Sequence, residues 1–272
     1  MRDNQERFSV MTDDVSASVS SNALSFVSPT ELVSLPSKGK YYSQNHPLHG
    51  KEEIEIKYMT AKEEDILSNK SLLKKGVAID RMLQSLIVDK SIKLESLLIG
   101  DKNAILIAAR ISAYGPEYAS QVTCPQCETR QKFEFDLSDL SEKECSSLEE
   151  NDAILNEKGN FVFKLPRSQV DVEIKTMTVG DEAKVTQELM KKKDISYIEQ
   201  MKTIVLSANG ETDKTLISSF VENLIASDAR HIRKVMSALL PDIDMTQTFL
   251  CSSCDYEEEM EVPLTAEFFW PK

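Results

Sequence analysis

The sequence predicts a helix-rich α+β protein made of two tandem, related halves that share one four-cysteine, zinc-ribbon-like site. Two CxxC pairs lie at a constant spacing, and short segments around them recur in the same order in both halves. Most apolar runs have helical periodicity and the chain contains only eight glycines, which favours helix over strand. Each half is therefore expected to hold a strand, several helices and a zinc knuckle.

The four paired cysteines are the strongest chemical signal in the chain. Cys124 pairs with Cys127, and Cys251 pairs with Cys254; each pair lies between two β-prone runs. Four thiolates form the tetrahedral ligand set of a structural Zn²⁺, and they leave no open position for catalysis. A redox CxxC would instead begin a helix after a strand. We therefore predict one structural zinc ion bound by all four thiols.

The spacing of these pairs indicates an internal duplication. Cys124 and Cys251 lie 127 positions apart, as do Cys127 and Cys254, and the same spacing relates LLIGD, which ends at Asp101, to LIASD. Upstream, IEIKYMTAKEE and VEIKTMTVGDE match at a spacing of 118. Three matches in the same order favour repetition over chance. We expect a flexible N-terminal arm at 1–33, a first repeat at 34–140, an acidic linker at 141–160 and a second repeat at 161–272.

The arm is rich in Ser, Asn and Asp and cannot bury enough apolar surface to fold alone. It is either a disordered tail or an extended arm that becomes ordered on a partner. The next stretch is punctuated by Pro and Gly and leads into a predicted strand at 53–59. Thr60 and Glu63 form a capping box, so a helix should begin at Thr60.

Further helices follow in the first repeat. One apolar helical face is predicted from Ile79 to Ile87, and Asp101 is expected to cap a helix that ends near Gly115. The acidic stretch after the first knuckle, 137–158, has weak patterning and is interpreted as the linker between the repeats.

In the second repeat, strands are predicted at 161–165 and 170–175, and Thr178 with Asp181 repeats the helix-starting pattern. An apolar stripe from Leu216 to Ile225 predicts a buried helix face, and Asp228 is expected to cap the last helix. The three aromatic residues Phe268, Phe269 and Trp270 are expected to be buried in a core or under a partner.

Composition excludes several classes of function. The net charge is −13 and the pI is about 4.8, which disfavours nucleic-acid phosphates and anionic membranes. No apolar run reaches the roughly 18 residues that a membrane span needs, and the N-terminal residues lack a signal-peptide core. We expect a cytosolic protein with reduced thiols.

Other candidate sites are better explained by structure. His46 and His49 form an HxxH on a loop, where two surface histidines are expected, and His231 is expected to be solvated or to cap a helix. Cys145 lies in an acidic stretch and receives no role. No nucleophile elbow, Walker loop, dinucleotide fingerprint or HExxH occurs, so no catalytic residue is assigned and the chain is not expected to be an enzyme.

Several runs resemble the baseplate hub and hub-assembly proteins of T-even-type contractile-tailed bacteriophages, from about Ser34 onward. These runs are SLPSKGKYY, IEIKYMTAKEEDIL, LLIGDKNAILIAARISAYGPEY, CPQC, ASDARHIRKV, CSSC and FFWP. The resemblance implies a structural or assembly role in the central hub of a viral tail baseplate, in the host cytoplasm, through contacts with other tail and baseplate hub proteins. It leaves open whether the chain remains in the virion. The alternative from another class is a cytosolic zinc-ribbon enzyme with an unrecognised active site.

Overall fold

The computed structural model describes residues 28–192, 197–264 and 268–269. Most of the expected N-terminal arm and Trp270 lie outside these described residues. The predicted mixture of helices and strands is confirmed. Strand β1 (Thr30–Ser34) begins just before the boundary expected for the first repeat, and it pairs antiparallel with β2 (Glu53–Lys57).

The chain continues as a group of helices that packs against this strand pair. The capping box of Thr60 and Glu63 is confirmed at the start of α1. Met82, Leu83 and Leu86 of α3 are fully buried, as the periodicity predicts. The helical elements are α1 (Ala61–Ser68), α2 (Lys70–Lys74), α3 (Ala78–Leu86), the 3-10 turn η1 (Leu94–Ser96) and α4 (Ile99–Tyr114).

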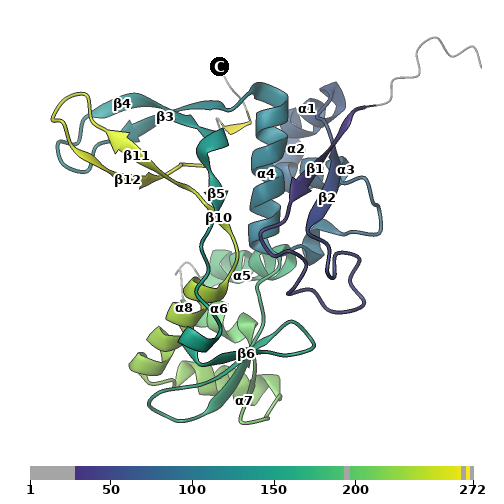
Figure 1. Ribbon diagram of the computed structural model, residues 1–272, viewed down its shortest axis with the longest axis vertical. Helices are drawn as coiled ribbons and strands as arrows, with labels where there is room; N and C mark the ends of the chain where they lie inside the picture. Colours follow the sequence, from purple (N-terminus) through teal and green to yellow (C-terminus); the bar gives the residue numbers. More distant parts are fainter. Residues whose placement is uncertain (1–27, 193–196, 265–267, 270–272) are drawn as a thin grey trace, which may run out of the picture.

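Two short hairpins lie side by side in the upper part of the molecule (Figure 1). The first consists of β3 (Glu117–Thr123) and β4 (Arg130–Asp136), followed by the 3-10 turn η2 (Leu137–Asp139). The second consists of β11 (Thr246–Leu250) and β12 (Glu257–Glu261), close to the end of the described chain.

The stretch expected to be a linker contributes to two sheets. Strand β5 (Ser141–Glu142) pairs with β10 (Ile243–Asp244), and β6 (Ala153–Leu155) follows the 3-10 turn η3 (Glu149–Asn151). Strand β6 is the edge of an antiparallel sheet in the order β6-β7-β8-β9. The remaining strands of that sheet are β7 (Phe161–Lys164), β8 (Asp171–Ile174) and β9 (Val205–Ala208).

Four helices accompany this sheet: α5 (Val179–Lys192), α6 (Tyr197–Ile204), α7 (Lys214–Glu222) and α8 (Ala226–Leu239). The start of α5 is the predicted one: Thr178 Oγ donates to Asp181, and the Asp181 N–H donates back to Thr178 Oγ. The apolar stripe predicted from Leu216 to Ile225 is only partly helical and partly buried: Ile217 and Val221 of α7 are buried, Leu216 is exposed, and the exposed Ile225 lies beyond α7, at the N-cap of α8. Strand β9 was not predicted, because it follows α6 without an intervening turn.

The buried side chains form two cores, and the second hairpin packs in the core of the first hairpin, not with α7, α8 and the four-stranded sheet that precede it in the chain. One core contains α3, α4, both hairpins and Phe268 with Phe269. The other contains the four-stranded sheet with α6, α7 and α8. The core with the hairpins lies at the top of Figure 1 and is called the upper core, and the core with the four-stranded sheet is called the lower core. The chain runs from the lower core back to the upper core along β10, so that the second CxxC pair meets the first.

The two cores contact each other closely where α4 and α5 begin. The Val179 N–H donates to Leu97 O at 2.9 Å, next to an antiparallel bridge between Leu98 and Thr178. A Cβ on Gly100 would lie 2.2 Å from Pro241 O, so only glycine permits this approach of α4 to the chain after α8.

Candidate metal centre

Each CxxC pair lies in the turn of a hairpin, and the two turns have the same backbone geometry. In the first, the Cys124 N–H donates to Thr129 O at 3.0 Å and the Glu128 N–H donates to Cys124 O at 3.0 Å. In the second, the Cys251 N–H donates to Tyr256 O at 2.8 Å and the Asp255 N–H donates to Cys251 O at 3.2 Å. The bonds join equivalent positions, so both turns present their thiols in the same way.

One residue in each turn has a left-handed backbone. Glu128 has a φ of 56° and Asp255 a φ of 55°, at the position directly after the second cysteine of each pair. Residues other than glycine rarely adopt this conformation, because Cβ approaches the backbone. The positive φ reverses the direction of the chain, so that it continues into the second strand of the hairpin.

The structure brings the four predicted cysteines together into one cluster. All four Sγ atoms lie within 4.8 Å of one another, although the two pairs are far apart in sequence. Cys124 Sγ lies 3.7 Å from Cys254 Sγ, and Cys127 Sγ lies 3.7 Å from Cys251 Sγ. A tetrahedral zinc ion with Zn–S distances of about 2.3 Å separates its sulfurs by about 3.8 Å. All five cysteines are free, so the cluster holds thiols of suitable spacing for a metal ion.

The surroundings of the thiols differ from one to the next. Cys124 and Cys251 are buried, whereas Cys127 is exposed. The Thr129 hydroxyl and its N–H lower the pKa of Cys127 to about 6. The Tyr256 N–H favours the thiolate of Cys254, but burial and the neighbouring thiols outweigh it and raise the pKa of Cys254 to about 12. Adjacent thiolates repel one another, and the positive charge of a bound dication would offset this repulsion and so favour the deprotonated form of every coordinating thiol.

Two glutamine side chains join the hairpins, Gln131 beside the cluster and Gln247 at the opposite end of the strands. Gln131 on β4 donates to Leu250 O at 3.1 Å and accepts the Ser252 N–H at 3.0 Å. Gln247 on β11 accepts the Asp136 N–H at 3.2 Å and donates to the carbonyl of the same residue. These side-chain bridges replace a continuous sheet, because no ladder joins β4 to β11 in the part of the chain that the structure describes.

Aromatic packing completes the contact between the hairpins and extends it to the last described residues. Phe133 packs edge-on against Phe249 with ring centroids 5.2 Å apart, and Phe268 packs edge-on against Tyr118 at 5.1 Å. Phe268 and Phe269 are 3% and 1% exposed, which confirms their predicted burial. The burial expected for Trp270 concerns a residue outside the described part of the chain.

The two aspartates expected to cap helices have a different role. The N-cap positions of α4 and α8 are Leu98 and Ile225, so Asp101 and Asp228 are each the third residue of a helix, and the N-cap prediction is wrong. Both carboxylates are fully buried. Their partners come from a distant loop, which is why a local pattern did not identify the role.

Asp101 binds the loop that follows β1. Its carboxylate accepts the Ser37 N–H at 3.0 Å, the Ser37 hydroxyl at 2.6 Å and the Tyr42 hydroxyl at 2.6 Å. The Tyr42 oxygen in turn accepts the Leu98 N–H at 3.1 Å. Burial raises the pKa of Asp101 above its usual value, even though all three donors favour the ionised form.

Asp228 binds the loop that follows β7. Its two carboxylate oxygens accept the Arg167 N–H and the Ser168 N–H, each at 2.9 Å. Burial opposes ionisation here too, but the Ser168 hydroxyl and the two N–H groups outweigh it and lower the pKa of Asp228. Both aspartates therefore fasten a loop of the sequence Leu-Pro-x-x to a helix N-terminus, where negative charge is favourable.

The remaining candidates have structural partners. His46 stacks on Tyr42 at 4.3 Å, and a His49 ring nitrogen lies 2.7 Å from Tyr42 O. Neither histidine belongs to a cluster of three or more potential metal ligands among the described residues. His231 is half-buried with its ring edge-on to Phe163, and Cys145 is exposed with its thiol directed at the carbonyl of Lys143.

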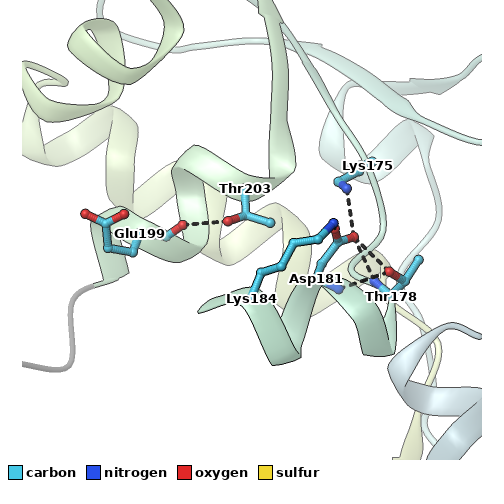
Figure 2. A network of polar contacts seen from close by, with 6 residues as sticks. All are labelled: Lys175, Thr178, Asp181, Lys184, Glu199 and Thr203. Atoms are coloured by element: carbon cyan, nitrogen blue, oxygen red, sulfur yellow. Dashed lines mark hydrogen bonds and ion pairs between the residues drawn. The ribbon is translucent and has the colours of Figure 1, made fainter. Parts of the chain in front are cut away.

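A polar network at the start of α5 is equally structural (Figure 2). The Asp181 carboxylate accepts Lys175 Nζ at 2.7 Å, and Lys184 Nζ lies 3.6 Å from its other oxygen. Burial opposes ionisation of Asp181, but Lys175 and Thr178 outweigh it and lower its pKa. The network thus combines a helix cap with an ion pair.

The fold and the thiol cluster define a mixed α+β protein whose two distant hairpins meet at a closed four-thiol site. The chain matches the family model described as T4 bacteriophage base plate protein over residues 29–270, and it belongs to this family. The resemblance seen in the sequence is thereby confirmed at the level of the baseplate family. Comparisons with curated proteins and with solved structures find no match. Among the described residues, no helix is both long and apolar enough to cross a bilayer.

Proposed function

We propose that the protein is a structural or assembly protein of the baseplate hub that acts through protein–protein contacts. The match to the baseplate family over residues 29–270 carries this proposal. Its partners would be other tail and baseplate hub proteins, which it would meet in the host cytoplasm during assembly and accompany into the virion tail. The proposed role is not enzymatic, and it involves neither nucleic acid nor a membrane.

The proposal includes one structural Zn²⁺ held by Cys124, Cys127, Cys251 and Cys254. Sulfur spacings of 3.7 Å and turns of equal geometry support it, because four thiolates at this spacing fill a tetrahedral coordination sphere. The ion would fasten the second hairpin to the first and so join segments far apart in the chain. It would stabilise the fold and take no part in a reaction.

We also propose an internal duplication, with repeats at 34–140 and 161–272 that are joined by a linker at 141–160. Four parallel features support it. Each repeat has an antiparallel strand pair, a helix that begins at a threonine cap, a helix with a buried aspartate at its third position and a CxxC hairpin. In each repeat the aspartate binds the loop of its own strand pair.

A complementation experiment tests the assembly role. A phage that lacks this gene would be supplied with the chain from a plasmid, and complete tails would be counted after sedimentation and their proteins identified by mass spectrometry. The parent chain should restore tails, the Cys124→Ala/Cys251→Ala variant should fail, and the control Cys145→Ala should match the parent. Normal tail yields without any supplied chain would contradict the assembly role, whereas normal yields with the double variant would contradict only the need for the metal.

A further inference from the structure

A hollow of about 540 Å³ lies where the two cores meet. Its lining residues come from α5, α6 and α8 of the lower core and from the first turn of α4 in the upper core. The lining is mainly apolar and includes three methionines, Met177, Met201 and Met236. Methionine side chains are flexible and polarizable, so such a lining adapts to inserted apolar groups of varied shape.

The rim of the hollow carries charges of both signs. Glu182 and Asp242 are acidic and already bind Lys102 and Asn103 of α4, and Arg233 is basic. The Arg233 guanidinium lies 5.3 Å from the ring centre of Tyr197, a wall residue that is 60% exposed. The hollow is thus open to water at an apolar wall, and it fits an apolar segment flanked by charges.

The chain contains a segment of this kind in residues 1–27, outside the described part. Phe8, Val10 and Met11 form an apolar group that follows Arg7 and precedes Asp13 and Asp14. Glu6 lies beside Arg7, so the clearest charge complement is that of Asp13 and Asp14 to the basic Arg233 of the rim.

The tether is long enough to reach the hollow. Met11 and Ser28 are 17 residues apart, and an extended chain of that length spans about 56 Å. A compact chain of 272 residues has a radius of gyration of about 19 Å. The segment can therefore reach the lower core from β1, and the covalent link gives it an effective concentration near the millimolar range.

We propose that residues 8–11 of the same chain occupy this hollow, with Phe8 and Met11 among the three methionines. This docking would cover the apolar wall at Tyr197 and fix α6 against α8. It is independent of the proposed metal ion and of the proposed place in the hub.

Photo-crosslinking of the full chain tests the proposal. The photoreactive residue p-benzoylphenylalanine would replace Phe8, and the matched control would carry it at Ala17 in the polar part of the segment. Because benzophenone reacts well with methionine C–H groups, mass spectrometry should find a cross-link within one chain to Met177, Met201 or Met236 from position 8 only. Mixing chains of two isotopic labels separates this from cross-links between copies.

Hydrogen exchange gives a second readout, with a variant that leaves every residue lining the hollow unchanged. In the Phe8→Asp/Met11→Asp variant the amides of α6 and α8 should exchange about tenfold faster than in the parent, while those of α3 stay unchanged. Cross-links only between copies, cross-links outside the hollow, or unchanged exchange in α6 and α8 would each overturn the proposal.

Discussion

Residues 30–136 and 161–261 each contain a CxxC hairpin and a buried aspartate that binds a loop, but the two aspartates have different surroundings. Each aspartate is the third residue of a helix and binds a Leu-Pro loop. In the first region the loop is long: the Leu35 N–H bonds to Glu52 O, and the intervening chain brings in Tyr42. In the second region the loop is tight, because the Leu165 N–H bonds to Val170 O.

The pKa values of the two aspartates therefore shift in opposite directions although both carboxylates are buried. At Asp101 burial dominates, the nearby charge of Asp242 adds to it, and the pKa is raised. The tight loop offers Asp228 its own N–H groups and a serine hydroxyl, which lower the pKa. The CxxC turns, in contrast, are alike in both regions. They make equivalent hydrogen bonds, and each has a residue with a left-handed backbone at the same position.

The largest effect is expected from removing one thiol of the proposed metal site. Cys124→Ala and Cys251→Ala should each abolish stoichiometric zinc and lower the free energy of unfolding by several kcal/mol, because metal binding contributes directly to folding. Zinc content and denaturant unfolding would measure both effects. Cys145→Ala is the control and should leave both unchanged. Retention of zinc by only one of the two variants would show that the two hairpins do not contribute equally to the metal site.

The buried aspartates should come next. Asp101→Ala leaves three donors without this acceptor, and Asp228→Ala leaves two N–H groups and the Ser168 hydroxyl, so each should cost about 2–3 kcal/mol. Denaturant unfolding of both variants measures these losses. Equal and small losses, within about 0.5 kcal/mol of the parent, would show that these loops are held by other contacts.

The two aspartates should also differ in pH dependence. The lowered pKa of Asp228 stabilises the fold above its ordinary pKa of about 3.9, and this contribution is lost as the pH falls through the folded value. The raised pKa of Asp101 has the opposite sign, so its contribution is present below about 3.9 and is lost as the pH rises through the folded value.

Asn variants measured from about pH 2.5 to about pH 6, a range that brackets the ordinary aspartate pKa, would separate these contributions. The stability difference between the parent and Asp228→Asn should shrink toward low pH, and the difference between the parent and Asp101→Asn should shrink toward high pH. The same trend for both variants would remove the distinction between the two surroundings.

The smallest effect concerns the left-handed residues of the two turns. Glu128→Gly and Asp255→Gly should each stabilise the protein by about 1 kcal/mol, because glycine adopts a positive φ without a steric cost. Thermal unfolding of the zinc-loaded protein would measure this. Opposite signs for the two substitutions would show that the turns differ in a way that their backbone geometry does not reveal.

Local patterns predicted most of the elements and the four clustered thiols. Thr60 with Glu63 and Thr178 with Asp181 mark helix starts because their partners lie three residues away. The role of Asp101 was mistaken because its partner Ser37 lies 64 positions away, and no local pattern encodes such a contact. The packing of the second hairpin on the first core is likewise tertiary, although the two CxxC pairs signalled that the hairpins meet.

Metal analysis of the purified chain tests the central claim, that two equivalent hairpins share one ion, most directly. Elemental analysis should give one zinc per chain, and X-ray absorption at the zinc edge should give four sulfur neighbours at about 2.3 Å. Two zinc ions per chain, nitrogen or oxygen atoms among the neighbours, or a chain that is fully folded without metal would contradict the account.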